Sequence, residues 1–186
     1  MSASPRTPVP QGLEEAVPMT LPRLAEKKLL GEPIVMITAY DYPSARVAQA
    51  AGVDIVLVGD SAATTVLGCS STVPVSVDEM LVLASAVRRG LRTPVLVGDL
   101  PFGSYEASNE QAIATAQRLV KEAGCDVVKL ERGGTSVQRA QAIVEARRNW
   151  GAGDCGHYLP PCVADALTID AIRARPCEPR TVRPCL

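Results

Sequence analysis

The stretch Ile55-Val56-Leu57-Val58-Gly59-Asp60-Ser61 decides the fold of this 186-residue chain. Its first four residues are apolar and mostly β-branched, a pattern typical of a strand that is buried on both faces. The apolar run stops at a glycine, a carboxylate at Asp60 and a hydroxyl at Ser61. Because parallel α/β folds place their chemistry at the carboxyl ends of their strands, these polar residues are candidates for a functional site.

Two later segments repeat this pattern. Residues 95–99 read Val-Leu-Val-Gly-Asp, and residues 127–131 read Val-Val-Lys-Leu-Glu. Carboxylate oxygens are the ligands that Mg²⁺ prefers, so three acids at three strand ends predict a divalent-cation site made of Asp60, Asp99 and Glu131. The alternative for each acid taken singly is a helix cap or an ordinary loop residue.

Lys129 stands two residues before Glu131, so both side chains are expected on the same side of their strand. A lysine inside a barrel is costly unless it is paired. We therefore expect Lys129 to meet an anionic substrate, the alternative being a lysine whose ammonium reaches solvent. Ser61 could bond a substrate carboxylate or cap its own loop.

Hydrophobic periodicity predicts strands alternating with helices. The strands are expected at 34–39, 54–58, 94–98 and 126–130, and the helices at 20–31, 43–52, 76–90, 108–124 and 137–146. This α/β order predicts a parallel sheet with right-handed crossovers, and its spacing resembles the first four βα units of a (β/α)8 TIM barrel. A doubly wound sheet is the rival, but it would be expected to carry a G-x-G-x-x-G fingerprint, which the sequence lacks.

The two ends of the chain differ from its centre. Residues 1–19 are proline-rich and predict a flexible arm, whereas residues 20–146 form the predicted half-barrel. Residues 147–186 form an atypical tail, expected to be poorly ordered, with no fifth strand and a short helix at 163–172. A shifted reading frame or a truncated gene product would explain the missing fifth unit, and a genuine divergent tail is the alternative.

Composition excludes several classes of protein. The net charge is −1 and no basic patch is interleaved with aromatics, so nucleic acid is not expected as a partner. No apolar run is long enough to span a bilayer and the N-terminus does not resemble a signal peptide, which predicts a cytoplasmic protein without a membrane partner. The six cysteines do not have a standard zinc-site spacing.

Several motifs, in order and at consistent spacing over residues 20–146, resemble those of the ketopantoate hydroxymethyltransferase family (3-methyl-2-oxobutanoate hydroxymethyltransferase). They are Ile-Thr-Ala-Tyr-Asp-Tyr-Pro at 37–43, Val-Gly-Asp-Ser at 58–61, Ser-Thr-Val-Pro-Val at 71–75, Val-Arg-Arg-Gly at 87–90, Asp-Leu-Pro-Phe at 99–102 and Val-Lys-Leu-Glu at 128–131.

The resemblance implies a (β/α)8 barrel that uses Mg²⁺ and 5,10-methylenetetrahydrofolate to hydroxymethylate a small 2-oxo acid, 3-methyl-2-oxobutanoate. The product is 2-dehydropantoate, in pantothenate and coenzyme A biosynthesis, and the reaction passes through a Mg²⁺-stabilised enolate. It also implies a homo-oligomer, a decamer in the family. Asp60 and Asp99 would bind the metal directly with Glu131 beside it, and Asp60, Ser61, Asp99 and Lys129 would contact the substrate.

The tail departs from the family pattern. Gly156-His157 matches the start of a family segment whose histidine touches substrate, but Tyr-Leu-Pro-Pro at 158–161 does not continue that segment. No catalytic residue is assigned, because the family's glutamate base belongs to a later strand. Two alternatives stay open: a carbon–carbon lyase of the isocitrate lyase type, and an inactive fragment of the transferase. The lyases share the Gly-Asp-Ser pattern but usually carry a Lys-x-Cys-Gly-His loop, which is missing here.

Overall fold

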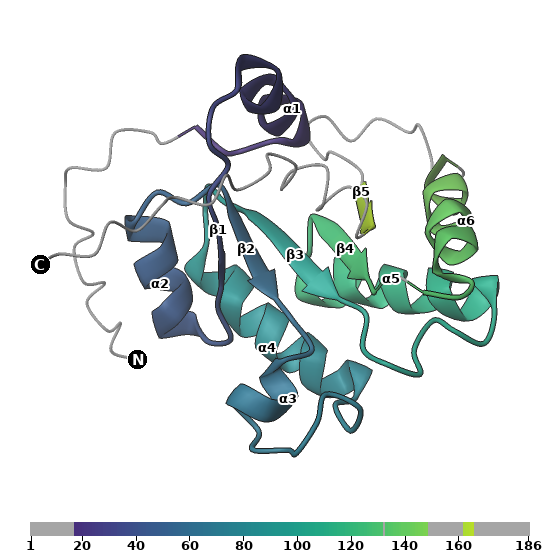
Figure 1. Cartoon of the computed structure of the whole chain (residues 1–186). Coiled ribbons are helices and arrows are strands. Elements are labelled where there is room, and N and C mark those ends of the chain that lie inside the picture. The colour runs from purple at the N-terminus through teal and green to yellow at the C-terminus, as the bar shows by residue number, and fades with distance from the viewer. Residues whose placement is uncertain (1–16, 132, 149–161, 166–186) are drawn as a thin grey trace, which may run out of the picture.

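The computed structural model describes residues 17–131, 133–148 and 162–165 and contains a parallel sheet whose strands lie in chain order (Figure 1). All four strand pairings are parallel, with Met36 opposite Ile55, Ile55 opposite Val95, and Val97 opposite Val127. The strands are β1 (Met36–Thr38), β2 (Ile55–Val58), β3 (Val95–Asp99), β4 (Val127–Leu130) and β5 (Cys162–Asp165).

The helices begin and end at residues that the sequence marks. The Ser76 hydroxyl accepts from the backbone N–H of Glu79, whose carboxylate accepts from the N–H of Ser76, which is a capping box. Gly31 and Gly124 end their helices in the left-handed region, each with φ of 70°. The helices are α1 (Leu21–Leu30), α2 (Tyr42–Ala50), α3 (Ala62–Thr65), α4 (Val77–Gly90), α5 (Asn109–Ala123) and α6 (Ser136–Arg148).

Helices α2, α4, α5 and α6 form one layer against the sheet, each contacting the next in chain order, while α1 lies near the amino-terminal ends of the strands (Figure 1). The described strands also follow one another without a reversal of order. A doubly wound sheet reverses its strand order and carries helices on both faces. The predicted parallel α/β fold is therefore confirmed, and the doubly wound rival does not fit the described strands.

The two faces of the sheet bury different residues. Val56, Leu96 and Val128 point toward the helix layer and join the larger hydrophobic core. Ile55, Val95, Val97 and Val127 point to the other face and pack with Leu24 of α1 in a smaller cluster. Strands β2, β3 and β4 are thus buried on both faces, as their uninterrupted apolar runs predict, whereas β1 is largely exposed.

Close packing explains two glycines. A Cβ at Gly98 of β3 would lie 2.8 Å from the sulfur of Cys125, and one at Gly90 would lie 2.7 Å from the Cβ of Ala45. Both distances are too short for real contacts, so Gly98 lets the sheet approach Cys125 and Gly90 lets α4 approach α2. Gly90 thus serves helix packing, and α4 extends through it.

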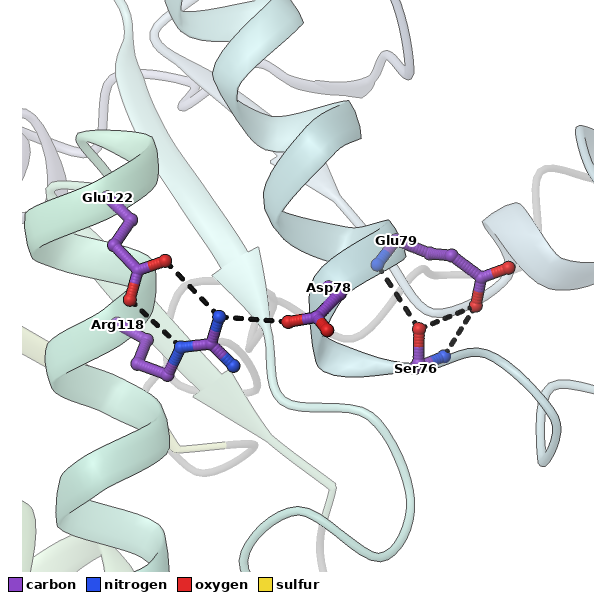
Figure 2. A network of polar contacts seen from close by, with 5 residues as sticks. All are labelled: Ser76, Asp78, Glu79, Arg118 and Glu122. Atoms are coloured by element: carbon purple, nitrogen blue, oxygen red, sulfur yellow. Dashed lines mark hydrogen bonds and ion pairs between the residues drawn. The ribbon is translucent and has the colours of Figure 1, made fainter.

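A polar network on the surface joins α4 to α5 (Figure 2). The Arg118 guanidinium on α5 donates to Asp78 of α4 at 2.8 Å and to Glu122, one turn further along α5, at 2.9 Å. All three side chains are largely exposed, so this network orients the helix ends more than it stabilises the fold.

Two predictions about irregular segments are wrong. Residues 162–165 form β5, which pairs with β4 in parallel, so a fifth strand is present and the predicted helix at 163–172 does not begin as a helix. The connection between β2 and α4 contains the short helix α3, where no helix was predicted. Residues 1–16, 149–161 and 166–186 lie outside the described residues, so the predicted arm and the disorder of the tail stay predictions.

Within the described ranges, no helix is both long and apolar enough to cross a bilayer.

Candidate active site

The centre of the candidate site is an ion pair between neighbouring strands. Asp99 ends β3 with 1% of its surface exposed, and the parallel register places it opposite Lys129 of β4. The Lys129 ammonium donates to both carboxylate oxygens of Asp99, at 2.9 and 2.7 Å. It also contacts the carboxylate of Glu131, an exposed residue directly after β4. Lys129 therefore bridges two of the three predicted metal-binding acids.

The surroundings of Asp99 disfavour its charged form. Burial raises the pKa of its carboxyl to about 6, the nearby charge of Asp60 adds to this, and Lys129 opposes it. Burial alone would lower the pKa of Lys129, but Asp99 and Glu131 outweigh it, so the pKa of the ammonium is raised. The site thus holds an acid whose negative charge Lys129 only partly compensates, and a permanent positive charge beside it.

Asp60 and Ser61 reach this pair from the end of β2. The backbone N–H of Asp60 points at an Asp99 carboxylate oxygen, 3.4 Å away. A Cβ at Gly59 would lie 3.1 Å from the Ser61 hydroxyl oxygen and 3.7 Å from Oδ2 of Asp99. Only the first distance is tighter than an ordinary contact, so the glycine of the Gly-Asp-Ser motif leaves room for the Ser61 hydroxyl.

Two tyrosines that were not predicted from the sequence belong to the site. The Tyr40 hydroxyl oxygen lies 2.7 Å from that of Ser61. Tyr105 is 7% exposed, and its hydroxyl pKa is raised by burial first and then by the charges of Glu106, Glu131 and Asp99. Tyr40 follows β1 as Asp60 follows β2, so its strand-end position was a usable signal. Tyr105 lies inside a loop, so its sequence position gave no signal of a role in the site.

The loop that carries Tyr105 is held by side chains around it. The Glu106 carboxylate accepts from the backbone N–H groups of Gly103 and Tyr105, at 2.9 and 3.2 Å. The Gln111 side chain donates to the Gly103 carbonyl, and the Thr115 hydroxyl donates to the Ser104 carbonyl at 2.7 Å. These bonds fix the loop between β3 and α5, so Tyr105 is held beside the strand ends.

The structure brings five of the six predicted site residues to one edge of the sheet: Asp60, Ser61, Asp99, Lys129 and Glu131. The sixth, His157, lies outside the described residues. Lys129, expected to meet an anionic substrate, meets the two carboxylates. Among the described side chains, no group of three carboxylates, histidines or cysteines is arranged to hold a metal ion, so the metal site stays a prediction.

A family model for ketopantoate hydroxymethyltransferase matches residues 18–149, which is most of the chain. The chain belongs to this family. It is 54% identical over 140 residues to 3-methyl-2-oxobutanoate hydroxymethyltransferase 1, mitochondrial, of Arabidopsis thaliana, which covers 75% of this chain and 40% of that relative. It is 53% identical over 129 residues to the enzyme of that name from Thermosynechococcus vestitus, covering 69% of this chain and 49% of the relative. The chain therefore spans less than half the length of these curated relatives of the transferase family.

Solved structures of similar fold come from another group of enzymes. A 2,3-dimethylmalate lyase of the PEP mutase/isocitrate lyase superfamily aligns with a TM-score of 0.56 at 18% identity, over 84% of this chain and 61% of the lyase. A phosphonopyruvate hydrolase in complex with oxalate and Mg²⁺ aligns with a TM-score of 0.55 at 13% identity, over 81% of this chain and 54% of the hydrolase. At such identities the likeness shows a shared TIM-barrel-like fold.

Proposed function

We propose that this chain forms the N-terminal half of a (β/α)8 ketopantoate hydroxymethyltransferase barrel and binds 3-methyl-2-oxobutanoate with Mg²⁺. The reaction served is hydroxymethyl transfer from 5,10-methylenetetrahydrofolate, which gives 2-dehydropantoate. The observation that carries the proposal is the buried Asp99 carboxylate, with Lys129 and the Asp60 backbone N–H beside it, in a chain 54% identical to a relative of that name.

The chemistry of the acids suits a magnesium ion. Asp60, Asp99 and Glu131 offer only oxygen ligands, and burial raises the pKa of Asp99, so a cation next to it would stabilise its charged form. Asp60 and Asp99 would hold the ion, with Glu131 beside it. Mg²⁺ would supply positive charge at the keto oxygen of the substrate, which makes the neighbouring C–H proton easier to remove.

The residues of the chain then have separate tasks. A cation at Asp99 would compete with Lys129 for the same carboxylate oxygens. The ammonium would then be available for another anion, and the carboxylate of the 2-oxo acid supplies one. Ser61, at the same edge, has a hydroxyl that can donate to that carboxylate. The base that removes the proton is not among these residues, so we assign binding and orientation of the acid to this half of the barrel.

Three parts of the proposal concern the one-carbon donor, the assembly and the compartment of the protein. The folate donor and a homo-oligomer, a decamer in the family, stay predictions, and so does the cytoplasm as compartment. The name of the Arabidopsis relative places that protein in the mitochondrion.

The lyase alternative receives no support beyond the shared fold, because the lyase and hydrolase aligned above are no more than 18% identical to this chain. The other alternative, an inactive fragment of the transferase, is tested by asking whether the chain binds the 2-oxo acid without converting it to product.

Calorimetric titration of the 186-residue chain with 3-methyl-2-oxobutanoate, with and without Mg²⁺, tests the proposal. We expect binding that requires Mg²⁺ and that is lost in Asp60→Ala and Asp99→Ala. The exposed Asp78→Ala variant, in the surface network of Figure 2, is the matched control and should bind as the wild type does. Wild-type binding that both site variants retain would refute the proposed site.

Turnover is measured separately, by adding 5,10-methylenetetrahydrofolate and by complementation of a pantothenate auxotroph. Growth would refute the interpretation of this chain as an inactive fragment. Mg²⁺-dependent binding without turnover or growth would support that reading and leave the binding assignment intact.

A further inference from the structure

Tyr40 is fixed on both sides along the chain. Before it, Ala39 is buried and its backbone N–H donates to the Leu57 carbonyl of β2 at 3.1 Å. After it, Asp41 caps α2, because its carboxylate accepts from the backbone N–H of Ser44 at 2.7 Å. The Tyr40 ring packs against the larger hydrophobic core. The phenol is therefore held at the strand ends by a rigid backbone and a packed ring.

The hydroxyl of this fixed ring lies 2.7 Å from the Ser61 hydroxyl oxygen, a normal distance for a hydrogen bond between two hydroxyls. Each group has one proton to donate. A phenol O–H is a stronger hydrogen-bond donor than an aliphatic O–H, so Tyr40 is the better donor of the two. When Tyr40 donates, the proton of Ser61 is free to point elsewhere.

The carbonyl of Ser61 is already engaged with its own helix. The hydroxyls of Thr64 and Thr65 donate to it at 3.0 and 2.9 Å, and the backbone N–H of Thr65 donates to it at 3.0 Å. These bonds hold the Ser61 backbone in place at the start of α3. The Ser61 side chain itself makes one hydrogen bond within the described residues, to Tyr40, which restricts its hydroxyl from one side.

We propose that Tyr40 is a positioning residue for the 2-oxo acid: it donates its proton to Ser61 and thereby turns the Ser61 proton toward the substrate carboxylate. The inference rests on the proposed function, because it needs the acid to bind at the strand ends. It adds a residue to that site that acts through Ser61 and not on the reacting atoms. The consequence is a preference for ligands with an anionic acceptor.

The test uses Tyr40→Phe, which removes only the hydroxyl, in the 186-residue chain with Mg²⁺ present. Affinity for 3-methyl-2-oxobutanoate should fall roughly fivefold, the size expected for one hydrogen bond. Affinity for the methyl ester, whose acceptor is uncharged, should change much less. In a Ser61→Ala background the Tyr40→Phe substitution should have no further effect on acid binding, since the residue it acts through is gone.

Tyr42→Phe is the matched control, because Tyr42 lies two residues away and is 49% exposed. It should leave the affinity unchanged. Thermal unfolding of all variants separates positioning from a purely structural role, which would lower the melting temperature and weaken the acid and the ester alike.

Three results would overturn the inference. Unchanged acid affinity in Tyr40→Phe, or an equal loss with Ser61 present and absent, would overturn it while leaving the proposed function standing. A folded wild-type chain that binds no acid in the presence of Mg²⁺ would overturn the proposed function and this inference with it.

Discussion

Two Lys–Asp pairs lie at opposite ends of the same sheet. At the amino-terminal end, Lys27 of α1 donates to both oxygens of Asp54, each at 2.8 Å. At the carboxyl end, Lys129 does the same to Asp99 at 2.9 and 2.7 Å. Both aspartates are buried, with 5% and 1% of their surface exposed. The contacts between the charges are therefore nearly the same.

The pairs differ in what else surrounds the carboxylate. Asp54 also accepts the backbone N–H of Val35 at 2.8 Å, so its charge has a third donor in good geometry. Asp99 has only the longer contact from the Asp60 backbone, and the charge of Asp60 lies close by. The first pair is satisfied within the protein, whereas the second leaves negative charge that a ligand can neutralise. This division, with stability at one end of the strands and chemistry at the other, is typical of βα barrels.

The largest effect is expected at the amino-terminal pair. Asp54→Ala leaves Lys27 and the Val35 N–H without their partner, so the free energy of unfolding should fall by about 3 kcal/mol. Urea denaturation followed by circular dichroism measures it. Asp126→Ala is the matched control, because Asp126 precedes β4 as Asp54 precedes β2 and accepts the Leu96 N–H, but its side chain is 48% exposed. Equal losses in the two variants would break the comparison.

A substitution in the carboxyl-end pair, Lys129 and Asp99, should change ligand binding and leave the stability of the fold nearly unchanged. Asp99→Asn keeps the shape of the side chain and leaves Lys129 its contact with Glu131, so the free energy of unfolding near pH 7 should change by less than about 1 kcal/mol. Mg²⁺-dependent affinity for the 2-oxo acid should fall by roughly a hundredfold or more, since the variant lacks a charged ligand. Calorimetry and urea denaturation on the same samples give both values. A variant as destabilised as Asp54→Ala would make Asp99 a structural residue.

The pH dependence of stability should sharpen the difference between the pairs. The pKa of Asp99 is raised to about 6 in the folded chain from its usual 3.8, so the folded state keeps a proton that the unfolded state has lost. Stability in the absence of metal should therefore decrease as pH rises from about 4 to about 6, by on the order of 2 kcal/mol from this group. Urea midpoints across this range measure it. Asp99→Asn should lack this contribution, and a parallel profile in that variant would contradict the assignment.

The smallest effect is expected at Gly59. Gly59→Ala adds a methyl group 3.1 Å from the Ser61 hydroxyl oxygen, which has to move by a few tenths of an ångström. Affinity for the acid should drop roughly three- to tenfold, while unfolding changes by about 1 kcal/mol or less. Titration of the variant measures the first and thermal unfolding the second. Unchanged affinity would mean that the position of Ser61 is not limiting.

Regular elements and strand-end acids could be predicted from the sequence because each has a local signal. The apolar runs predict β2 to β4, the Ser76 and Glu79 pair predicts the start of α4, and the acids at 60, 99 and 131 predict the site edge. The fifth strand was missed because residues 162–165 contain a cysteine and an alanine after two prolines, with no clear period.

Partners across the sheet could not be predicted in the same way. That Lys129 faces Asp99 depends on the register of β3 against β4, and that Tyr40 meets Ser61 depends on β1 lying beside β2. No local sequence pattern predicts the register of either strand pair. The sequence therefore predicts which residues reach the edge, and the three-dimensional structure adds which of them touch.

The order of the strands has a consequence for how the chain acquires its structure. Because every described strand pairs with the one before it in the chain, each βα unit can add to a sheet that already exists. Each pairing joins consecutive units, so the units can be added in order from the N-terminus during synthesis. Asp60, Asp99 and Lys129 belong to β2, β3 and β4 and the residues just after them. The acid–lysine cluster can thus assemble before β5 joins the sheet.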